Sequence, residues 1–255
     1  MNAFSSIDSI PLIALHGWGM DASSWDSLSP FIANKIPFQA LNLPGYAGVP
    51  ELPNMSMDNV VDWLAEQFDG KCHLLGWSMG GLVAQAFTKK YPEKIVSLTM
   101  VGSTPCFTKK TSWPNALEPE ILTKFVENLQ DNKSTTLRRF IALQFMGESA
   151  AAGIQKQLRK AVTKQVTSLS TLALGLSWLR NCDYRESRSL LTTAQHWMFG
   201  ELDQLVPVAV GAALQNAFPD IMVSYFEGCG HAPQLTQPER FAEKLLYFIS
   251  QHTSK

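Results

Sequence analysis

The chain has 255 residues, of which 45% are hydrophobic and 17% charged, with 14 Pro, 16 Gly and a formal net charge of −1 at pH 7. This size and composition suit one large α/β core or a core with an inserted subdomain, and they exclude fibrous, low-complexity and disordered classes. The four cysteines are widely scattered without a C-x-x-C pair, so they indicate neither a zinc site nor a disulfide framework and favour a reducing compartment.

The first part of the chain alternates short apolar strands with helices. Buried strands are predicted at residues 11–15, 38–43, 72–75 and 95–101. A helix is predicted from about residue 56 to 68, because apolar residues recur there at the spacing of a core-facing stripe. Another helix is predicted from residue 81 to about 90. Strands that alternate with helices predict a parallel sheet built of βαβ units.

The pattern changes after Cys106. From about residue 117 to 180 we find no convincing strand, only helical periodicity at residues 121–129, 137–145, 154–166 and 169–179. Strands return at residues 194–199 and 221–226, and a final amphipathic helix covers residues 238–250. We therefore predict an α/β fold with a mostly parallel central sheet and helices on both faces. Residues 1–106 and 191–255 would form this core, and residues 107–190 an inserted all-helical cap.

The stretch Gly76-Trp77-Ser78-Met79-Gly80 lies between a predicted strand and a predicted helix. It fits a strand-to-helix turn that presents a serine hydroxyl as a nucleophile, and glycine on both sides suits a turn with no room for Cβ atoms. A Gly-x-Ser-x-Gly match is expected by chance in roughly one of ten chains of this length. A glycine-rich loop that opens a helix is therefore the alternative, and the hypothesis needs the partners of a nucleophile.

Those partners are predicted in loops that follow other strands. The carboxyl ends of parallel strands meet at one rim of the sheet, so loops 200–203 and 228–231 should open beside Ser78. A nucleophilic serine needs a general base, and the base needs a carboxylate to orient it. His231 and Asp203 supply these groups, in the chain order Ser, Asp, His that such a turn predicts. Glu201 is the rival of Asp203, and a surface or capping role is the alternative for His231.

Two backbone N–H groups are candidates for an oxyanion hole, which would bind the negative charge that ester hydrolysis builds on the carbonyl oxygen. One is the N–H of Met79, directly after the candidate nucleophile, and the other is the N–H of Trp18, in the glycine-flanked loop after the first strand. His16 is expected to orient this loop. His73 and His196 lie within predicted strands, where a core role is expected.

Together these motifs resemble the α/β-hydrolase superfamily over essentially the whole chain. The set is His16-Gly-Trp-Gly, Gly76-Trp-Ser-Met-Gly-Gly81, Tyr91-Pro-Glu, Gly200-x-x-Asp203-x-x-x-Pro207 and Gly230-His231-Ala-Pro. Within the superfamily the chain is similar to the methyl ester carboxylesterases of biotin synthesis. That similarity is carried by Leu15-His-Gly-Trp-Gly, Leu75-Gly-Trp-Ser-x-Gly-Gly-Leu-Val-Ala84, Ser103-x-Pro-Cys-Phe107, Trp113-Pro114 and Arg139-Phe-Ile-Ala-Leu-Gln-x-Met-Gly147. The last string lies in the predicted cap, outside the catalytic motifs, so it discriminates between members.

The resemblance implies hydrolysis of the methyl ester of pimeloyl-acyl-carrier protein, with release of methanol. Family substrate contacts carry over onto Trp18, Ser78, Met79, Phe140, Ile141, Ala142, Leu143, Gln144 and His231. In the family, basic cap residues hold the acidic carrier protein. Arg139 and Lys156 match such positions, whereas Thr135 and Ala152 stand where arginines are expected.

The charge distribution bears on the same partner. Residues 105–190 contain 13 Lys/Arg against 7 Asp/Glu, a net charge of +6, whereas the rest of the chain carries −7. The candidates for holding an acidic carrier protein are Arg138, Arg139, Lys156, Arg159 and Lys160. The last three share one predicted helix face with Lys164. A solvated helix face is the alternative, but such faces normally mix signs, which favours an acidic partner. Nucleic acid is disfavoured because the rest of the chain is acidic and no binding motif is present.

The apolar run at residues 10–15 is too short for a signal sequence or a membrane span. We expect a monomeric cytoplasmic enzyme without metal, cofactor or membrane association. Two alternatives remain open: another hydrolase or a lyase that acts on a free small molecule with the same three residues, and a non-catalytic binding protein that retains the fold. A dehalogenase is disfavoured because the turn carries Ser rather than Asp.

Overall fold

The computed structural model describes residues 10–148, 151–162, 167–187, 190 and 192–252. Six strands form one all-parallel sheet in the order β2-β1-β3-β4-β5-β6. The strands are β1 (Leu12–Leu15), β2 (Phe38–Leu41), β3 (Cys72–Trp77), β4 (Ile95–Val101), β5 (Ala194–Gly200) and β6 (Met222–Phe226). The predicted α/β class and the six predicted strands are confirmed.

Burial along the strands follows their place in the sheet. Every residue of β1 and β3 is buried, whereas most residues of the edge strands β2 and β6 are half-buried or exposed. A parallel strand covered by helices on both faces needs a continuous apolar run, which is why the central strands are easy to recognise in the sequence. β2 ends at Leu41 rather than at residue 43, because the N–H of Leu43 donates to Nε2 of His16 instead of a neighbouring strand.

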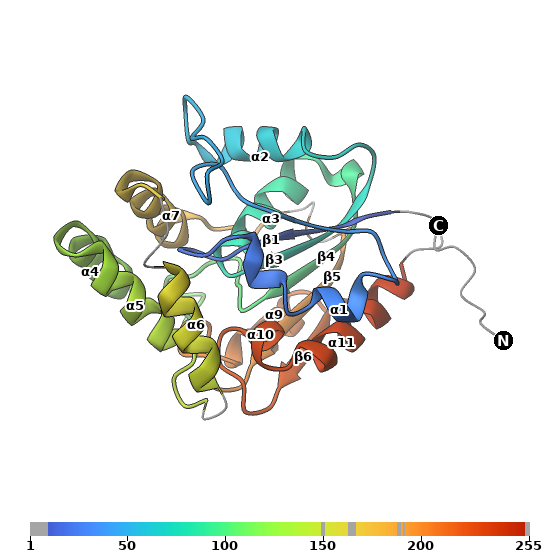
Figure 1. The fold of residues 1–255 in the computed structure, drawn as a ribbon. Coiled ribbons are helices and arrows are strands. Elements are labelled where there is room, and N and C mark those ends of the chain that lie inside the picture. Colours follow the sequence, from blue (N-terminus) through green and yellow to red (C-terminus); the bar gives the residue numbers. More distant parts are fainter. Residues whose placement is uncertain (1–9, 149–150, 163–166, 188–189, 191, 253–255) are drawn as a thin grey trace.

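Helices cover both faces of the sheet (Figure 1). α2 (Met57–Ala65) and α3 (Met79–Lys90) lie on one face, and α1 (Ser29–Ile32) and α11 (Pro238–Ser250) on the other. The hydroxyl of Ser56 accepts from the N–H of Asn59 and so begins α2, which ends three residues before the predicted boundary at 68. Five short elements were not predicted: α1, η1 (Ala22–Trp25), η2 (Pro92–Lys94), α9 (Ala209–Ala217) and α10 (Pro233–Thr236).

Between β4 and β5, the described residues include four helices whose bounds are defined, and these lie together at one end of the sheet (Figure 1): α4 (Pro119–Asp131), α5 (Lys133–Gln144), α6 (Ala152–Val162) and α7 (Leu169–Asn181). We call this group the cap helices. α5 begins four residues before the prediction, because Asn132 caps it and its polar first turn carries no apolar periodicity. Residues 163–166 of the predicted third helix, Lys164 among them, lie outside the described residues. The division at residues 106 and 190 stays a prediction.

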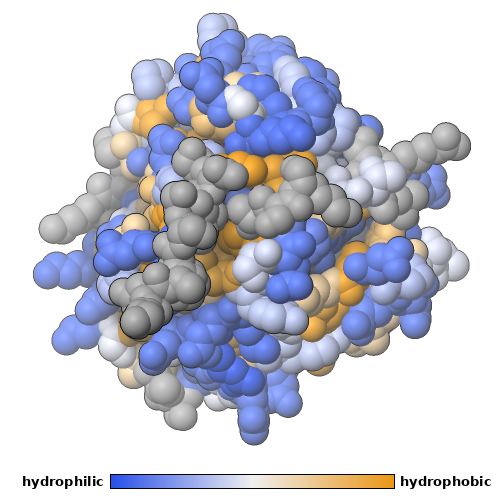
Figure 2. Space-filling model, turned by 90° about the vertical axis from the view of Figure 1, so that its right-hand side faces the viewer, coloured by the Kyte–Doolittle hydropathy of each residue, from blue (hydrophilic) through white to orange (hydrophobic). Residues whose placement is uncertain are grey.

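The side of the molecule away from the cap helices (Figure 1) is mostly hydrophilic where the structure describes it, with hydrophobic residues gathered near its middle (Figure 2). Within the described part of the chain, every helix falls short of the length and apolarity needed to cross a membrane. The predicted functional residues Ser78, Asp203 and His231 follow the carboxyl ends of β3, β5 and β6.

Candidate active site

Ser78 lies at the turn between β3 and α3, with φ 54° and ψ −116°. This backbone conformation is strained for a residue other than glycine, typically by about 1–3 kcal/mol. Close packing holds the turn: a Cβ atom on Gly76 would lie 2.5 Å from the carbonyl oxygen of Gly80, and one on Gly80 would lie 2.5 Å from that of Leu15. The Ser103 hydroxyl donates to the carbonyl oxygen of Ser78 at 3.0 Å. The strain and its supports are those of a turn built to present one side chain.

His231 and Asp203 form a fully buried pair. Nδ1–H of His231 donates to Oδ2 of Asp203 at 2.7 Å, and neither side chain is exposed to solvent. The other carboxylate oxygen of Asp203 accepts from the N–H groups of Leu205 and Val206 at 2.8 and 2.9 Å. Glu201, the rival carboxylate, is exposed and instead accepts from the N–H of Gly228 at 3.3 Å. The structure thus brings Asp203, and not Glu201, to the histidine.

The free nitrogen of the same ring is available for proton transfer. Among the described residues, Nε2 of His231 is buried without a hydrogen-bond partner. Buried polar atoms are usually paired, so this unpaired nitrogen of the histidine that Asp203 orients can still form a hydrogen bond to another group. Backbone bonds fix the ring from two sides: the Trp77 indole donates to the carbonyl oxygen of His231 at 2.9 Å, and the N–H of His231 donates to the carbonyl oxygen of Gln144 at 2.7 Å.

The loop after β1 packs directly on the serine turn. A Cβ atom on Gly17 would lie 3.4 Å from Cβ of Ser78, so the loop backbone passes over that side chain. His16 orients the loop: its Nδ1–H donates to the carbonyl oxygen of Gly17 at 2.9 Å, and its Nε2 accepts from Leu43 at 3.1 Å. Burial lowers the pKa of His16 to about 4, which keeps it in the neutral form that this pair of bonds requires. The loop that carries Trp18 and the N-terminal turn of α3, which begins at Met79, thus adjoin one another beside Ser78.

The cap helices close the site from above. The Trp18 indole donates to the carbonyl oxygen of Leu172 in α7 at 2.8 Å, and its ring makes an edge contact with Phe140 of α5 at 4.7 Å. A Cβ atom on Gly175 would lie 2.7 Å from the Trp18 ring and 2.8 Å from Sδ of Met79. Ser78 is only 3% exposed and His231 not at all. The candidate site is therefore enclosed between the sheet rim and α5 and α7.

Sequence reasoning missed the α7 contacts to this site. Leu172 accepts through its backbone carbonyl oxygen, which every residue has, so its residue type could not predict this contact. Gly175 did carry a signal, because a glycine inside a helix is less stable than alanine by about 1 kcal/mol and often marks a close approach. Its position against Trp18 and Met79 explains why a side chain is absent there.

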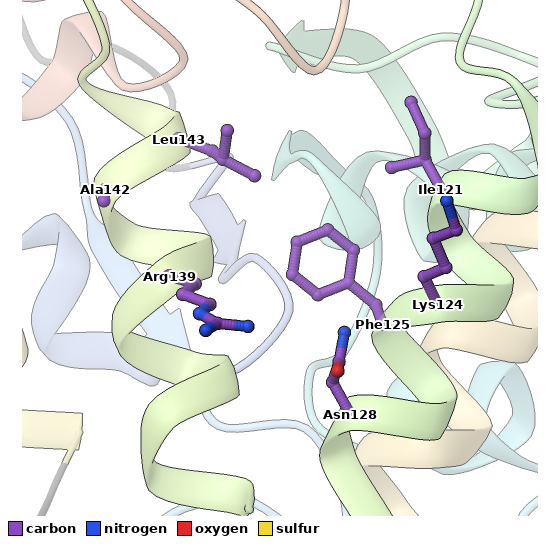
Figure 3. Close-up of a pocket in the computed structure, with 7 residues that line it drawn as sticks. All are labelled: Ile121, Lys124, Phe125, Asn128, Arg139, Ala142 and Leu143. Atoms are coloured by element: carbon purple, nitrogen blue, oxygen red, sulfur yellow. The ribbon is translucent and has the colours of Figure 1, made fainter.

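The stretch predicted to contact substrate, residues 140–144, faces two ways. Phe140, Ile141 and Gln144 are buried toward the core, whereas Ala142 and Leu143 are half-buried. The latter two line a cavity of about 390 Å³ between α4 and α5, into which Arg139 and Asn128 point from opposite helices beside the Phe125 ring (Figure 3). The full lining is Ile121, Lys124, Phe125, Asn128, Arg139, Ala142 and Leu143. The ring centroids of Phe125 and Phe140 are 5.7 Å apart, and Phe140 in turn contacts Trp18. The rings of Phe125 and Phe140 therefore lie between this cavity and Trp18.

The basic residues proposed from the sequence lie on the outside of the cap helices. Arg138 and Arg139 are exposed on α5, and Lys156, Arg159 and Lys160 are exposed on α6, which packs against α5. Arg159 donates to the side chain of Gln155 at 3.3 Å. Of the predicted basic group, Arg139 alone also lines the cavity between α4 and α5.

Other titratable groups lie in the sheet or apart from one another. His73 and His196 pair with the hydroxyls of Ser97 and Ser224 at 2.7 and 2.9 Å, and burial lowers their pKa values to about 4 and about 3. Both are buried within strands. All four cysteines are free thiols. Over the described ranges, no group of three or more His, Cys, Asp or Glu side chains is arranged to hold a metal ion.

Residues 12–244 match the model of the alpha/beta hydrolase family. The chain belongs to this family. Its relatives include the pimeloyl-[acyl-carrier protein] methyl ester esterase of Aeromonas salmonicida, 36% identical over 245 residues that cover 93% of this chain and 94% of that protein. The enzyme of the same name from Yersinia pseudotuberculosis serotype IB is 34% identical over 242 residues, which cover 94% of this chain and 93% of the relative. The resemblance to these esterases is thus confirmed.

Solved structures agree on the fold. An esterase from Exiguobacterium antarcticum superposes with a TM-score of 0.86 at 19% identity, covering 95% of this chain and 92% of that one. A bromoperoxidase from Bacillus anthracis superposes with a TM-score of 0.85, also at 19% identity and with the same coverage of both chains. At such identities the likeness establishes the architecture alone, and the chemistry has to be argued from the residues.

Proposed function

We propose that this chain is a serine carboxylesterase that hydrolyses the methyl ester of pimeloyl-acyl-carrier protein to pimeloyl-acyl-carrier protein and methanol in biotin synthesis. The observation that carries the proposal is the buried His231–Asp203 pair, whose free Nε2 lacks a partner among the described residues beside the strained turn at Ser78. Relatives that match over more than nine tenths of the chain are named for this substrate, which supports the choice of ester.

The first half of the reaction uses three groups. The Ser78 hydroxyl attacks the ester carbonyl carbon while Nε2 of His231 takes its proton, and the Asp203 carboxylate stabilises the resulting imidazolium. The carbonyl oxygen becomes an oxyanion, which the N–H groups of Trp18 and Met79 would bind. Met79 opens α3, so the positive end of the helix dipole also favours negative charge at this point.

Collapse of the tetrahedral intermediate breaks the bond to the methoxy oxygen. His231 returns the proton to that oxygen, methanol leaves, and the acyl group stays on Ser78 as an ester. Water then enters, gives a proton to His231 and attacks the acyl carbon through the same oxyanion hole. The imidazolium protonates the Ser78 oxygen as it departs, which releases the carboxylic acid and restores the enzyme; the acid then loses its proton to water.

The carrier is proposed to dock on the exposed faces of α5 and α6. Arg138, Arg139, Lys156, Arg159 and Lys160 present five positive charges there, and acyl carrier proteins are acidic in the family that the chain resembles. Because Arg139 belongs both to this face and to the cavity between α4 and α5, we place the entry of the acyl arm at that cavity. The rings of Phe125 and Phe140 then mark the route toward Trp18.

We place the reaction in the cytoplasm, where the four free thiols stay reduced. All the proposed catalytic groups come from one chain, so a monomer is sufficient for the chemistry.

The catalytic assignment is tested by Ser78→Ala. Methanol release from pimeloyl-acyl-carrier protein methyl ester should fall by at least about 10³-fold, because the variant lacks the nucleophile. An organophosphonate should label the wild-type chain at Ser78 and leave the variant unlabelled, since only an activated serine reacts readily. Retention of more than a tenth of the wild-type rate by the variant would contradict the assignment, and an unlabelled wild type would favour a non-catalytic binding protein.

The carrier assignment is tested by comparing the same ester on the carrier protein and on a short thiol. Reversing two charges with Lys156→Glu and Arg159→Glu should lower kcat/KM for the carrier-linked ester by about 10-fold or more and leave the short thiol ester unchanged, because exposed charges mainly steer association. The matched control is Lys35→Glu with Lys71→Glu, two exposed lysines of the core. Equal kcat/KM for both esters in the wild type would favour a small-molecule esterase instead.

A further inference from the structure

The loop that carries His231 is bonded to the end of cap helix α5. The N–H of His231 donates to the carbonyl oxygen of Gln144 at 2.7 Å, and the N–H of the preceding Gly230 donates to Oε2 of Glu148 at 2.9 Å. Both bonds are buried, and Glu148 itself is only 8% exposed. Two successive amides next to the proposed base are therefore held by the last turn of α5 and the residues that follow it.

This loop has no slack on the side of the core. A Cβ atom on Gly200, at the end of β5, would collide with the carbonyl oxygen of Gly230. The N–H of Leu202 donates to the carbonyl oxygen of Cys229 at 2.8 Å. On the opposite side, a Cβ atom on Gly230 would collide with the carbonyl oxygen of Gln144. The Gly230 peptide is thus clamped between the β5 turn and α5, and a change on the α5 side has to be transmitted to the histidine.

A carboxylate is an unusual choice for this position if its role is packing alone. Burying an ionised group is unfavourable unless it is paired or hydrogen-bonded. A bond from an amide to a carboxylate is also about twice as strong as one to a neutral acceptor. Asp203 holds the His231 ring, and the Trp77 indole holds the His231 carbonyl oxygen. The backbone N–H groups of the loop are held by the end of α5 and by Glu148.

We propose that Glu148 is a positioning residue for the esterase reaction: its carboxylate holds the Gly230 amide so that Nε2 of His231 is aimed at the Ser78 hydroxyl. This inference rests on the proposed function. Because the acceptor follows α5, which also carries Arg138 and Arg139, the base is fully positioned only while α5 is seated on the core. Docking on the cap helices and alignment of the proposed base are then linked through the end of α5, by the Gln144 carbonyl oxygen and the Glu148 side chain.

The test measures kcat and KM of Glu148→Ala on a short soluble ester that needs no carrier. Loss of the acceptor should lower kcat by about 10- to 100-fold, as expected for a displaced catalytic group, with KM within about 2-fold of the wild-type value. Glu148→Gln keeps an oxygen acceptor and should restore kcat to within about 3-fold of wild type. Glu127→Ala removes an exposed carboxylate of α4 and should match the wild type.

Each rate is normalised to the active sites titrated with an organophosphonate, so that loss of folded protein is not counted as loss of kcat. Glu148→Asp, which keeps the charge but withdraws the acceptor by one methylene, covers the case in which the alanine variant does not fold, and its kcat should fall by about 3-fold or more. Wild-type kcat in the alanine and aspartate variants, or a glutamine variant as slow as the alanine one, overturns the inference. An inactive wild type, or an active Ser78→Ala, would instead overturn the proposed function.

Discussion

Lowering the pH from 7.5 to 5.0 should remove a large part of the free energy of unfolding, because three buried histidines fold in the neutral form. Burial lowers the pKa to about 4 for His16 and His73 and to about 3 for His196, against about 6.5 in an unfolded chain. Between these values the unfolded state binds more protons than the folded state. The stabilisation is therefore complete above pH 6.5 and is lost as the pH falls toward 4.

The magnitude follows from the same pKa values. At pH 5.0 each of these histidines is largely protonated in the unfolded chain and neutral in the folded one, a difference of about 2 kcal/mol per residue. Three such residues give about 6 kcal/mol, which is comparable to the whole stability of a typical domain. The hydrogen bonds agree with this direction for His16, whose Nε2 accepts from Leu43 and cannot do so once protonated.

Urea unfolding followed by tryptophan fluorescence at pH 7.5, 6.5 and 5.0 measures the effect. The control variants are His73→Asn and His196→Gln. In each, an amide that does not titrate takes the place of the ring nitrogen that pairs with Ser97 or Ser224 in the wild type. Each should lose about 2 kcal/mol less than the wild type over the same pH change. Equal unfolding free energies at pH 7.5 and 5.0, or variants that keep the full pH dependence, would refute the reasoning.

Two further substitutions probe the site. Asp203→Asn should lower kcat by about 10⁴-fold with little change in KM, because an amide favours the wrong tautomer of the histidine; a loss below about 10-fold in steady-state ester hydrolysis argues against Asp203 as the carboxylate that orients His231. Gly175→Ala places a methyl group 2.7 Å from the Trp18 ring and 2.8 Å from Sδ of Met79, so kcat/KM and the thermal midpoint should both fall. Gly153→Ala, with open space around the new atom, should raise the midpoint slightly, and equal behaviour of the two variants speaks against a close contact at α7.

The central strands could be predicted because burial on both faces demands a continuous apolar run. The predicted β4 span, 95–101, is the observed one. The edges were harder, since β2 ends where a hydrogen bond from Leu43 to His16 replaces the strand ladder. α9 was not predicted because its sequence, AVGAALQNA, is rich in small residues and lacks charged ones that would mark a solvent face.

The candidate site divides in the same way between local and long-range information. Ser78, Asp203 and His231 stand in short motifs whose residue types and order carry the chemistry, so they could be proposed from the sequence. The contacts from the cap helices could not. Trp18 bonds to a residue 154 positions away, and Gly230 to one 82 positions away. Such pairs are set by how helices seat on a sheet, and a single sequence has no periodicity or motif that encodes them.

The positive φ angle at Ser78 also limits which nucleophile this turn can hold. At φ 54° a β-branched residue is a genuine steric outlier, because its second γ substituent meets the neighbouring peptide. Threonine, a secondary alcohol, is therefore excluded, whereas cysteine has the same branching as serine and fits the backbone. Ser78→Cys is thus sterically compatible with this turn, whereas Ser78→Thr would require a different backbone conformation at position 78.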